Sequence, residues 1–155
     1  MTLDSTDRRL LQLLQTDAQA TAQALGDRLN LSASQTGRRR QRLEEEGIVT
    51  GYRAALDPER VGLTVEAFIQ ITMATHTQKN AADFVRLTHR RSEIVTAWTL
   101  TGDADYLLRV FVRDLSALNA LVQDVLLPHP AVNRVQSQIV MDRIKLDAPL
   151  PVLDV

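Results

Sequence analysis

Hydrophobic residues recur at helical spacing along the first fifty residues. Two stripes have this spacing, one formed by Leu3, Leu10, Leu11 and Leu14 and the other by Ala22, Leu25 and Leu29. Asp4, Thr21 and Ser32 can each cap a helix, because their side-chain oxygens accept hydrogen bonds from the unpaired amides of a first turn. The third helix is expected to run to Glu46 and to end at Gly47. This pattern predicts a helix-turn-helix domain over residues 1–50.

After Gly47 the pattern changes to the alternation that is typical of strands. The stretch "IVTGYRAAL" alternates and is rich in β-branched or aromatic residues, and "DPERVG" follows as a turn. The runs beyond it read as β-α-β-β-α-β: "VEAFIQITMAT", "TQKNAADFVRLTHRR", "IVTAWTLTG", "DYLLRVFVRD", "LSALNALVQDVLLPHP" and "AVNRVQSQIVMDRIK". We therefore predict an α+β protein with a strand linker over residues 51–62. A ferredoxin-like domain over residues 63–155 follows, with an antiparallel sheet backed by two helices.

Composition limits the classes of protein that this chain can belong to. It has 155 residues, of which 45% are hydrophobic, which is enough for a packed core in one domain or two small ones. The formal net charge of -1 gives no global attraction to nucleic acid or to an anionic membrane, so any electrostatic argument must be local. The chain has no cysteine, its start does not resemble a signal peptide, and no stretch is apolar enough to span a bilayer. We expect a cytoplasmic protein without a membrane partner.

Local charge is concentrated in "SASQTGRRRQRLEEEG", residues 32–47, which carries four arginines within five positions. A charge run on a helix is commonly a solvated face, but its placement on the helical wheel favours another interpretation. If Leu43 faces the core, the outward and flanking side chains are those of Ser34, Gln35, Arg38, Arg39, Gln41 and Arg42. Such side chains suit the major groove, where arginine reads guanine, glutamine reads adenine, and hydroxyls or arginines hold phosphates. Arg40 falls on the inward side, so we expect its head to reach water or an acidic group.

Two aspartates, Asp103 and Asp105, lie in the turn "GDADY" between two predicted strands. They could form a general acid/base pair or part of a cation site, or they could simply favour a tight turn. No nucleophile, histidine partner or phosphate-binding loop accompanies them, so we predict no catalytic residues and no enzyme activity. The histidines are scattered and lack the spacing of zinc ligands, so neither a metal site nor a cofactor is expected.

Two segments resemble the Lrp/AsnC (leucine-responsive, feast/famine) transcriptional regulators. They are "LNLSASQTGRRRQRLEEEGIVTGYRAALDPERVG" and "TLTGDADYLLRVFVRDLSALNALVQDVLLPHPAVNRVQSQIVMDRIK". The two segments occur in the family's order and separation, and the resemblance extends over almost the whole chain. The resemblance implies an N-terminal winged helix-turn-helix domain, a strand linker and a ferredoxin-like module. In this family that module dimerises through its sheets and assembles dimers further, often into octamers.

The resemblance also implies where ligands bind. Contacts to double-stranded DNA carry over to Ser34, Gln35, Arg38, Arg39 and Arg42. The family's amino-acid effector site lies near the loop formed here by Thr101, Gly102, Asp103, Ala104, Asp105 and Tyr106. A free amino acid carries an ammonium and a carboxylate. A turn with an acidic side chain and exposed backbone amides can bind both groups. Spacing alone leaves open which aspartate would contact the ammonium.

We therefore expect a homo-oligomeric transcriptional regulator that binds duplex DNA and responds to a small amino acid. A first alternative is an amino-acid sensor or oligomerisation module with weak or no DNA binding. A second alternative is a small enzyme that uses Asp103 or Asp105, since the ferredoxin-like scaffold hosts unrelated functions.

Overall fold

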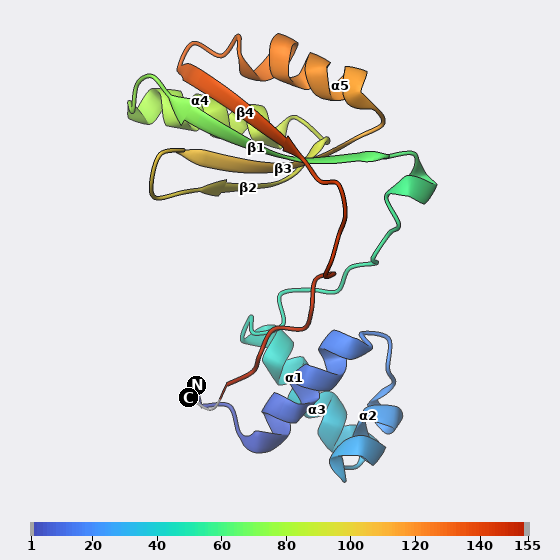
Figure 1. Cartoon of the computed structure of the whole chain (residues 1–155). Helices are drawn as coiled ribbons and strands as arrows, with labels where there is room; N and C mark the ends of the chain where they lie inside the picture. The colour runs from blue at the N-terminus through green and yellow to red at the C-terminus, as the bar shows by residue number, and fades with distance from the viewer. Residues whose placement is uncertain (1, 154–155) are drawn as a thin grey trace. The chain divides into compact units, whose positions relative to one another are not determined.

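The computed structural model describes residues 2–153, which form two compact units. Of the described residues, the first unit contains 2–55 together with the tail 144–153, and the second unit spans Leu56–Arg143. Figure 1 shows the helices of the first unit and the sheet of the second. The tail therefore belongs with the helical unit, whereas the sequence suggested that it would form part of the ferredoxin-like domain.

The first unit is built from three helices, α1 (Ser5–Thr16), α2 (Ala22–Leu29) and α3 (Ala33–Glu45). The three predicted caps are confirmed, because the side chains of Asp4, Thr21 and Ser32 each accept a backbone amide of the first turn. Asn30 adopts the left-handed conformation at the end of α2, with φ of 56°, and this sharp turn leads into α3. A small core holds the unit together, formed by Leu10, Leu11, Leu14, Leu25, Leu29 and Leu43.

Neither the wing nor the strand linker forms in the single chain. Residues 2–64 contain three α-helices and the short 3-10 helix η1 (Glu59–Val61), but no strand. The β-like composition of residues 48–56 is not sufficient, because a strand needs a neighbouring backbone with which to exchange hydrogen bonds.

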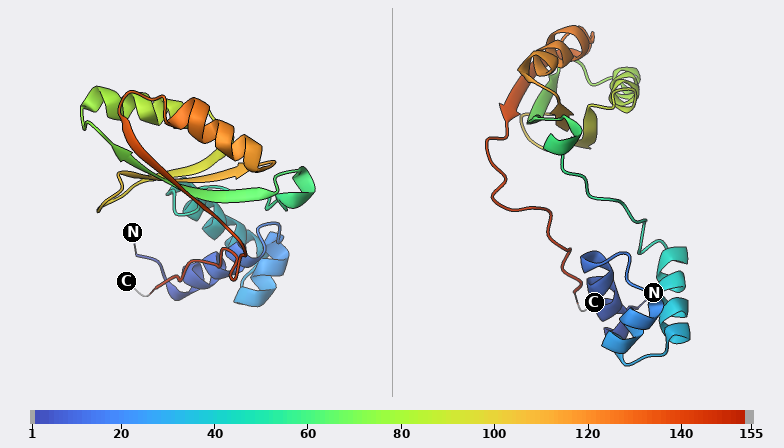
Figure 2. Two further views of the ribbon diagram at one scale, coloured as in Figure 1. Left: turned by 45° about the horizontal axis from the view of Figure 1, so that its top comes forward. Right: turned by 90° about the vertical axis from the view of Figure 1, so that its right-hand side faces the viewer.

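The second unit has the predicted β-α-β-β-α-β order. Its elements are β1 (Val65–Met73), α4 (Gln78–His89), β2 (Ile94–Thr99), β3 (Tyr106–Val112), α5 (Leu115–Ala120) with its π-helical continuation η2 (Leu121–Leu126), and β4 (Val132–Ile139). The strands form one antiparallel sheet in the order β2-β3-β1-β4. Both helices cover the same face of this sheet, as Figures 1 and 2 show. This is the expected ferredoxin-like arrangement.

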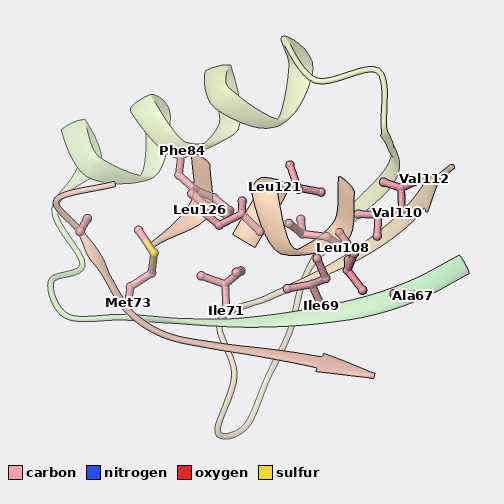
Figure 3. Packing of buried hydrophobic residues seen from close by; sticks show 12 residues of the cluster. Ala67, Ile69, Ile71, Met73, Phe84, Leu108, Val110, Val112, Leu121 and Leu126 are labelled. Carbon is pink, nitrogen blue, oxygen red and sulfur yellow. The ribbon is translucent and has the colours of Figure 1, made fainter. Parts of the chain in front are cut away.

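Alternation along the strands places the core of the second unit between the sheet and its helices. Ile69 and Ile71 on β1 are fully buried, and Figure 3 shows them beneath Phe84 of α4 and Leu126 of η2. The last strand is shorter than its sequence suggests, which corrects the prediction that it continues to Lys145. Its final ladder contact is the bond from the Val140 amide to the Glu66 carbonyl, at 2.9 Å, because β1 begins only one residue before Glu66.

Candidate DNA-binding surface and effector loop

One face of α3 is open to solvent along its first three turns. Ser34, Gln35, Arg38 and Gln41 are exposed on it, whereas Thr36 and Leu43 on the opposite face are fully buried. The Gln35 side chain also completes a capping box, since its Oε1 accepts the Ser32 amide at 3.0 Å. Its amide nitrogen keeps its donors, so the face offers hydroxyl, amide and guanidinium groups together.

The arginines of α3 differ sharply in what they contact. Arg38 makes no side-chain hydrogen bond or ion pair with the described residues. Arg39 Nη1 instead lies 2.6 Å from Asp4 Oδ2 and 2.7 Å from Asp7 Oδ1. Arg42 Nη2 lies 2.6 Å from Asp7 Oδ2. Two of the five predicted DNA contacts are therefore already paired with acidic groups on α1.

The environment of Arg40 agrees with the sequence expectation. Its Nε lies 3.0 Å from Glu44 Oε1, and its guanidinium carbon lies 4.7 Å from the centroid of the Tyr52 ring. Desolvation acts to lower the pKa of Arg40, but the interactions with Glu44 and Tyr52 outweigh it, so the pKa lies above its ordinary value. The Tyr52 hydroxyl also donates to Glu44 Oε1 at 2.7 Å, and with Arg40 it lowers the pKa of Glu44. This arginine is thus a structural cation.

The predicted effector residues form the turn that joins β2 to β3. Thr101, Gly102 and Asp103 are exposed, and residues 104–106 are partly buried. Gly102 has φ of 115°, a conformation that favours glycine. Residues 101–105 therefore lie in one short loop with exposed polar groups near its tip, whereas Tyr106 is the first residue of β3 and its ring centroid lies 4.7 Å from that of Phe84 in the core.

The two aspartates of this loop have different surroundings. Asp105 Oδ2 accepts the Met73 amide at 2.7 Å, and the Asp105 amide donates to the Ile71 carbonyl at 2.9 Å, so this residue ties the loop to β1. His76 Nδ1 lies 3.5 Å from Asp105 Oδ1. The Asp103 carboxylate has no partner among residues 2–153. Asp105 therefore has a structural role, whereas the Asp103 carboxylate is available to bind a ligand.

The sheet face opposite the helices is apolar in places and carries a paired charge. Phe68, Leu107 and Phe111 are only half-buried on it, and Trp98 on the edge strand is 43% exposed. The Glu66 carboxylate, with 8% of its side chain exposed, accepts hydrogen bonds from Arg109 Nε and Arg143 Nε, each at 2.6 Å. Both guanidinium groups also lie over the Phe111 ring.

Comparison with known proteins agrees with both halves of this arrangement. Residues 3–44 match the AsnC-type helix-turn-helix domain, and residues 66–150 match the Lrp/AsnC ligand binding domain. The chain belongs to the Lrp/AsnC family. This is a family of transcriptional regulators and not of enzymes, so the chain is a DNA-binding regulator rather than a catalyst.

Several Lrp/AsnC proteins are similar to this one over nearly their whole length. The DNA-binding transcriptional activator DecR of Escherichia coli is 35% identical over 97% of this chain and 99% of its own. The leucine-responsive regulatory protein of Escherichia coli is 33% identical, over 92% of this chain and 87% of its own. The complex of a transcriptional regulator of Neisseria meningitidis with L-Met superposes with a TM-score of 0.93. It is 39% identical over 97% of both chains.

Neither a metal centre nor a membrane span appears in the described part of this Lrp/AsnC protein. Residues 2–153 bring together no group of three or more histidine, aspartate or glutamate side chains that could hold a metal ion. No helix within the same residues is long and apolar enough to cross a bilayer.

Sequence reasoning missed Asp7, the residue on which Arg39 and Arg42 converge. Asp7 is almost fully buried on α1, but the hydrophobic pattern of this helix predicts burial only for its leucines. A signal was present in the spacing of Asp4 and Asp7, which form a reciprocal capping box. That signal predicts a helix start but not an ion pair with a helix more than thirty residues away.

Proposed function

We propose that this regulator reads duplex DNA with the open face of α3 lying in the major groove. The observation that carries the proposal is the cluster of Ser34, Gln35 and Arg38, which are exposed together. In this assignment Gln35 and Arg38 contact base edges or phosphates, and Arg39 and Arg42 contact the flanking backbone. Gly37 supports it, because a β-carbon there would have no described atom within 4 Å outside its own helix backbone, so α3 is open to a close approach at this position.

The protein acts as a homodimer that assembles into higher oligomers, in keeping with the family. The half-buried aromatic side chains and exposed Trp98 on the open sheet face support a contact between two copies there. Two copies related by a twofold axis would place their α3 helices about one turn of DNA apart, or a multiple of it. Operators are therefore expected to be roughly palindromic.

The effector is a free amino acid bound at the loop of residues 101–106. The unpaired Asp103 carboxylate binds the ammonium group of the amino acid, and exposed backbone amides of the loop donate hydrogen bonds to its carboxylate. Asp105 keeps the loop in place through the Met73 amide. Binding then changes DNA affinity by linkage, because an effector that prefers one assembly shifts the population towards it.

A salt titration tests the DNA-binding assignment. Arg38→Ala should weaken binding to a duplex selected from a random library, and should reduce the slope of log affinity against log salt by about 1. Arg90→Ala is the matched control, since it removes the same charge from an exposed site at the end of α4. Equal affinity and slope for Arg38→Ala and the unaltered protein would refute the α3 assignment and favour an amino-acid sensor without DNA binding.

Thermal denaturation with each of the twenty amino acids tests the effector assignment, starting with L-Met because of the similar Neisseria complex. An amino acid that binds only the folded protein raises the melting temperature. Asp103→Asn should abolish that shift without changing the melting temperature of the free protein. Asp105→Asn should lower the melting temperature of the free protein, because the hydrogen bond from the Met73 amide of β1 becomes weaker. If no amino acid shifts the melting temperature, the effector assignment fails.

A further inference from the structure

Two arginines of α3 converge on one carboxylate of α1. Asp7 Oδ1 accepts Arg39 Nη1 at 2.7 Å, and Asp7 Oδ2 accepts Arg42 Nη2 at 2.6 Å. Only 2% of the Asp7 side chain is exposed. Such short, charge-assisted bonds at a buried site fix the geometry of both partners far better than a solvated surface pair does.

The cluster is electrically balanced, and each of its four carboxylate oxygens accepts at least one hydrogen bond. Asp4 and Asp7 carry two negative charges, and Arg39 and Arg42 carry two positive charges, which gives a sum of zero. Asp7 Oδ2 also accepts the Asp4 amide at 3.3 Å, and the Asp7 amide donates to Asp4 Oδ1 at 2.7 Å. The capping box at the start of α1 thus fixes the Asp7 carboxylate that binds both arginines.

The two arginines nevertheless keep donors for another partner. Arg42 uses only Nη2, its Nη1 and Nε have no partner among the described residues, and 43% of its side chain is exposed. Arg39 is 28% exposed and uses only Nη1 in these contacts. Both guanidinium groups are therefore fixed at one end while their remaining N–H groups stay available.

We infer that Asp7 is a positioning residue for DNA recognition, which orients the guanidinium groups of Arg39 and Arg42 towards the backbone of a specific site. This inference rests on the proposed binding of DNA by α3. Fixed arginines favour a complex in which each phosphate has a defined place, because their ordering cost has already been met before binding. Binding to an arbitrary sequence gains little from such order, since mobile charges serve equally well.

The test compares Asp7→Asn with the unaltered protein by fluorescence anisotropy on two duplexes. One duplex is selected by the unaltered protein from a random library, and the other is a shuffled sequence of the same composition. Asp7→Asn should weaken binding to the selected duplex about tenfold, the scale expected when two side chains lose their order. Binding to the shuffled duplex should not weaken, because both arginine charges remain and the substitution removes a negative charge beside them.

A purely structural role for Asp7 would lower the melting temperature but leave the ratio of the two affinities unchanged, and that outcome overturns the inference. Repeating the substitution with Arg39→Gln and Arg42→Gln present provides a control, since Asp7→Asn should then have no further effect on the ratio. If the unaltered protein itself does not distinguish the duplexes, the failure lies with the proposed function. The two failures are therefore separable.

A measurement on the unaltered protein covers the case in which Asp7→Asn does not fold. In ¹⁵N relaxation experiments on arginine side chains, the Nε–Hε groups of Arg39 and Arg42 should be rigid. That of Arg38, which has no partner in the described chain, should be mobile. Equal mobility of Arg38 and Arg42 in the DNA-free protein would overturn the inference without any variant.

Discussion

Gly26 of α2 lies so close to Leu31 that a β-carbon at position 26 would sit 2.6 Å from the Leu31 carbonyl oxygen. The same β-carbon would lie 3.1 Å from Thr36 Oγ1, so glycine allows α2 and α3 to meet at the turn. The obstacle at 2.6 Å is backbone and cannot rotate away. Gly26→Ala should therefore destabilise the helical unit by about 1 to 3 kcal/mol, the range for overpacked sites. Urea unfolding followed by circular dichroism measures this, and an unchanged midpoint would contradict the close approach.

Gly37 provides the matched comparison, because a β-carbon there would meet nothing within 4 Å. Gly37→Ala should raise the free energy of unfolding by about 0.8 to 1.0 kcal/mol, since glycine is a poor helix former. Position 37 lies on the same face of α3 as Ser34 and Gln41, three residues before it and four after it. Affinity for the selected duplex should therefore fall although the protein becomes more stable. If affinity stays the same, the backbone at Gly37 does not approach DNA.

The sequence allowed prediction of features that depend on neighbouring residues. The caps at Asp4, Thr21 and Ser32 were predictable because each side chain reaches an amide only three residues away. The order of strands and helices was predictable from periodicity. The end of β4 was not, because it depends on where β1 begins on the other side of the ladder.

The candidate site shows the same division between local and distant information. The helical wheel placed Ser34, Gln35 and Arg38 outward, because helical geometry decides this once Leu43 is assigned to the core. The pairing of Arg39 and Arg42 with Asp7 depends on how α3 packs against α1, across 32 and 35 residues of sequence. The difference between Asp103 and Asp105 depends on the Met73 amide of another strand.

The C-terminal tail is attached to α1 through a reciprocal pair of hydrogen bonds. Gln15 Nε2 donates to the Leu150 carbonyl at 3.1 Å, and the Leu150 amide donates to Gln15 Oε1 at 2.6 Å. Val152 packs against the core of the same unit. Gln15→Ala should remove both bonds. Because both are exposed to water, each should contribute only about 0.5 kcal/mol to stability. Hydrogen exchange at the Leu150 amide should become faster.

Gln12→Ala is the control for this substitution. Gln12 lies one turn earlier on α1, is exposed, and makes no side-chain hydrogen bond in the described chain. Its replacement should leave exchange at Leu150 unchanged. Equal exchange rates in Gln15→Ala and Gln12→Ala would show that the tail is not held by the Gln15 amide.

Glu66 makes the stability of the second unit depend on pH. Desolvation acts to raise the pKa of this carboxyl, but hydrogen bonds from Arg109 and Arg143 outweigh it and hold the pKa below its ordinary value. A lowered pKa in the folded protein stabilises the fold fully above the ordinary pKa of a glutamate. That stabilisation is lost as the pH falls through the lower, folded value. Stability should therefore decrease with acid below about pH 4.5.

Comparison with Glu66→Gln isolates the contribution of this one carboxyl from that of the other acidic groups. At pH 7 the variant leaves two guanidinium groups facing a neutral amide. Because Arg109 and Arg143 are 26% and 34% exposed, water compensates part of the loss, and the variant should be less stable by about 1 to 2 kcal/mol. Below about pH 4.5 Glu66 takes up a proton in the unfolded chain before it does so in the folded protein, so the difference between the two urea midpoints should shrink as the pH falls towards 3. Glu59→Gln, at an exposed site whose side chain has no partner in the described chain, should show no such convergence. A gap between Glu66→Gln and the unaltered protein that stays constant from pH 7 to pH 3 would mean that packing, and not the ionised carboxylate, accounts for the role of Glu66.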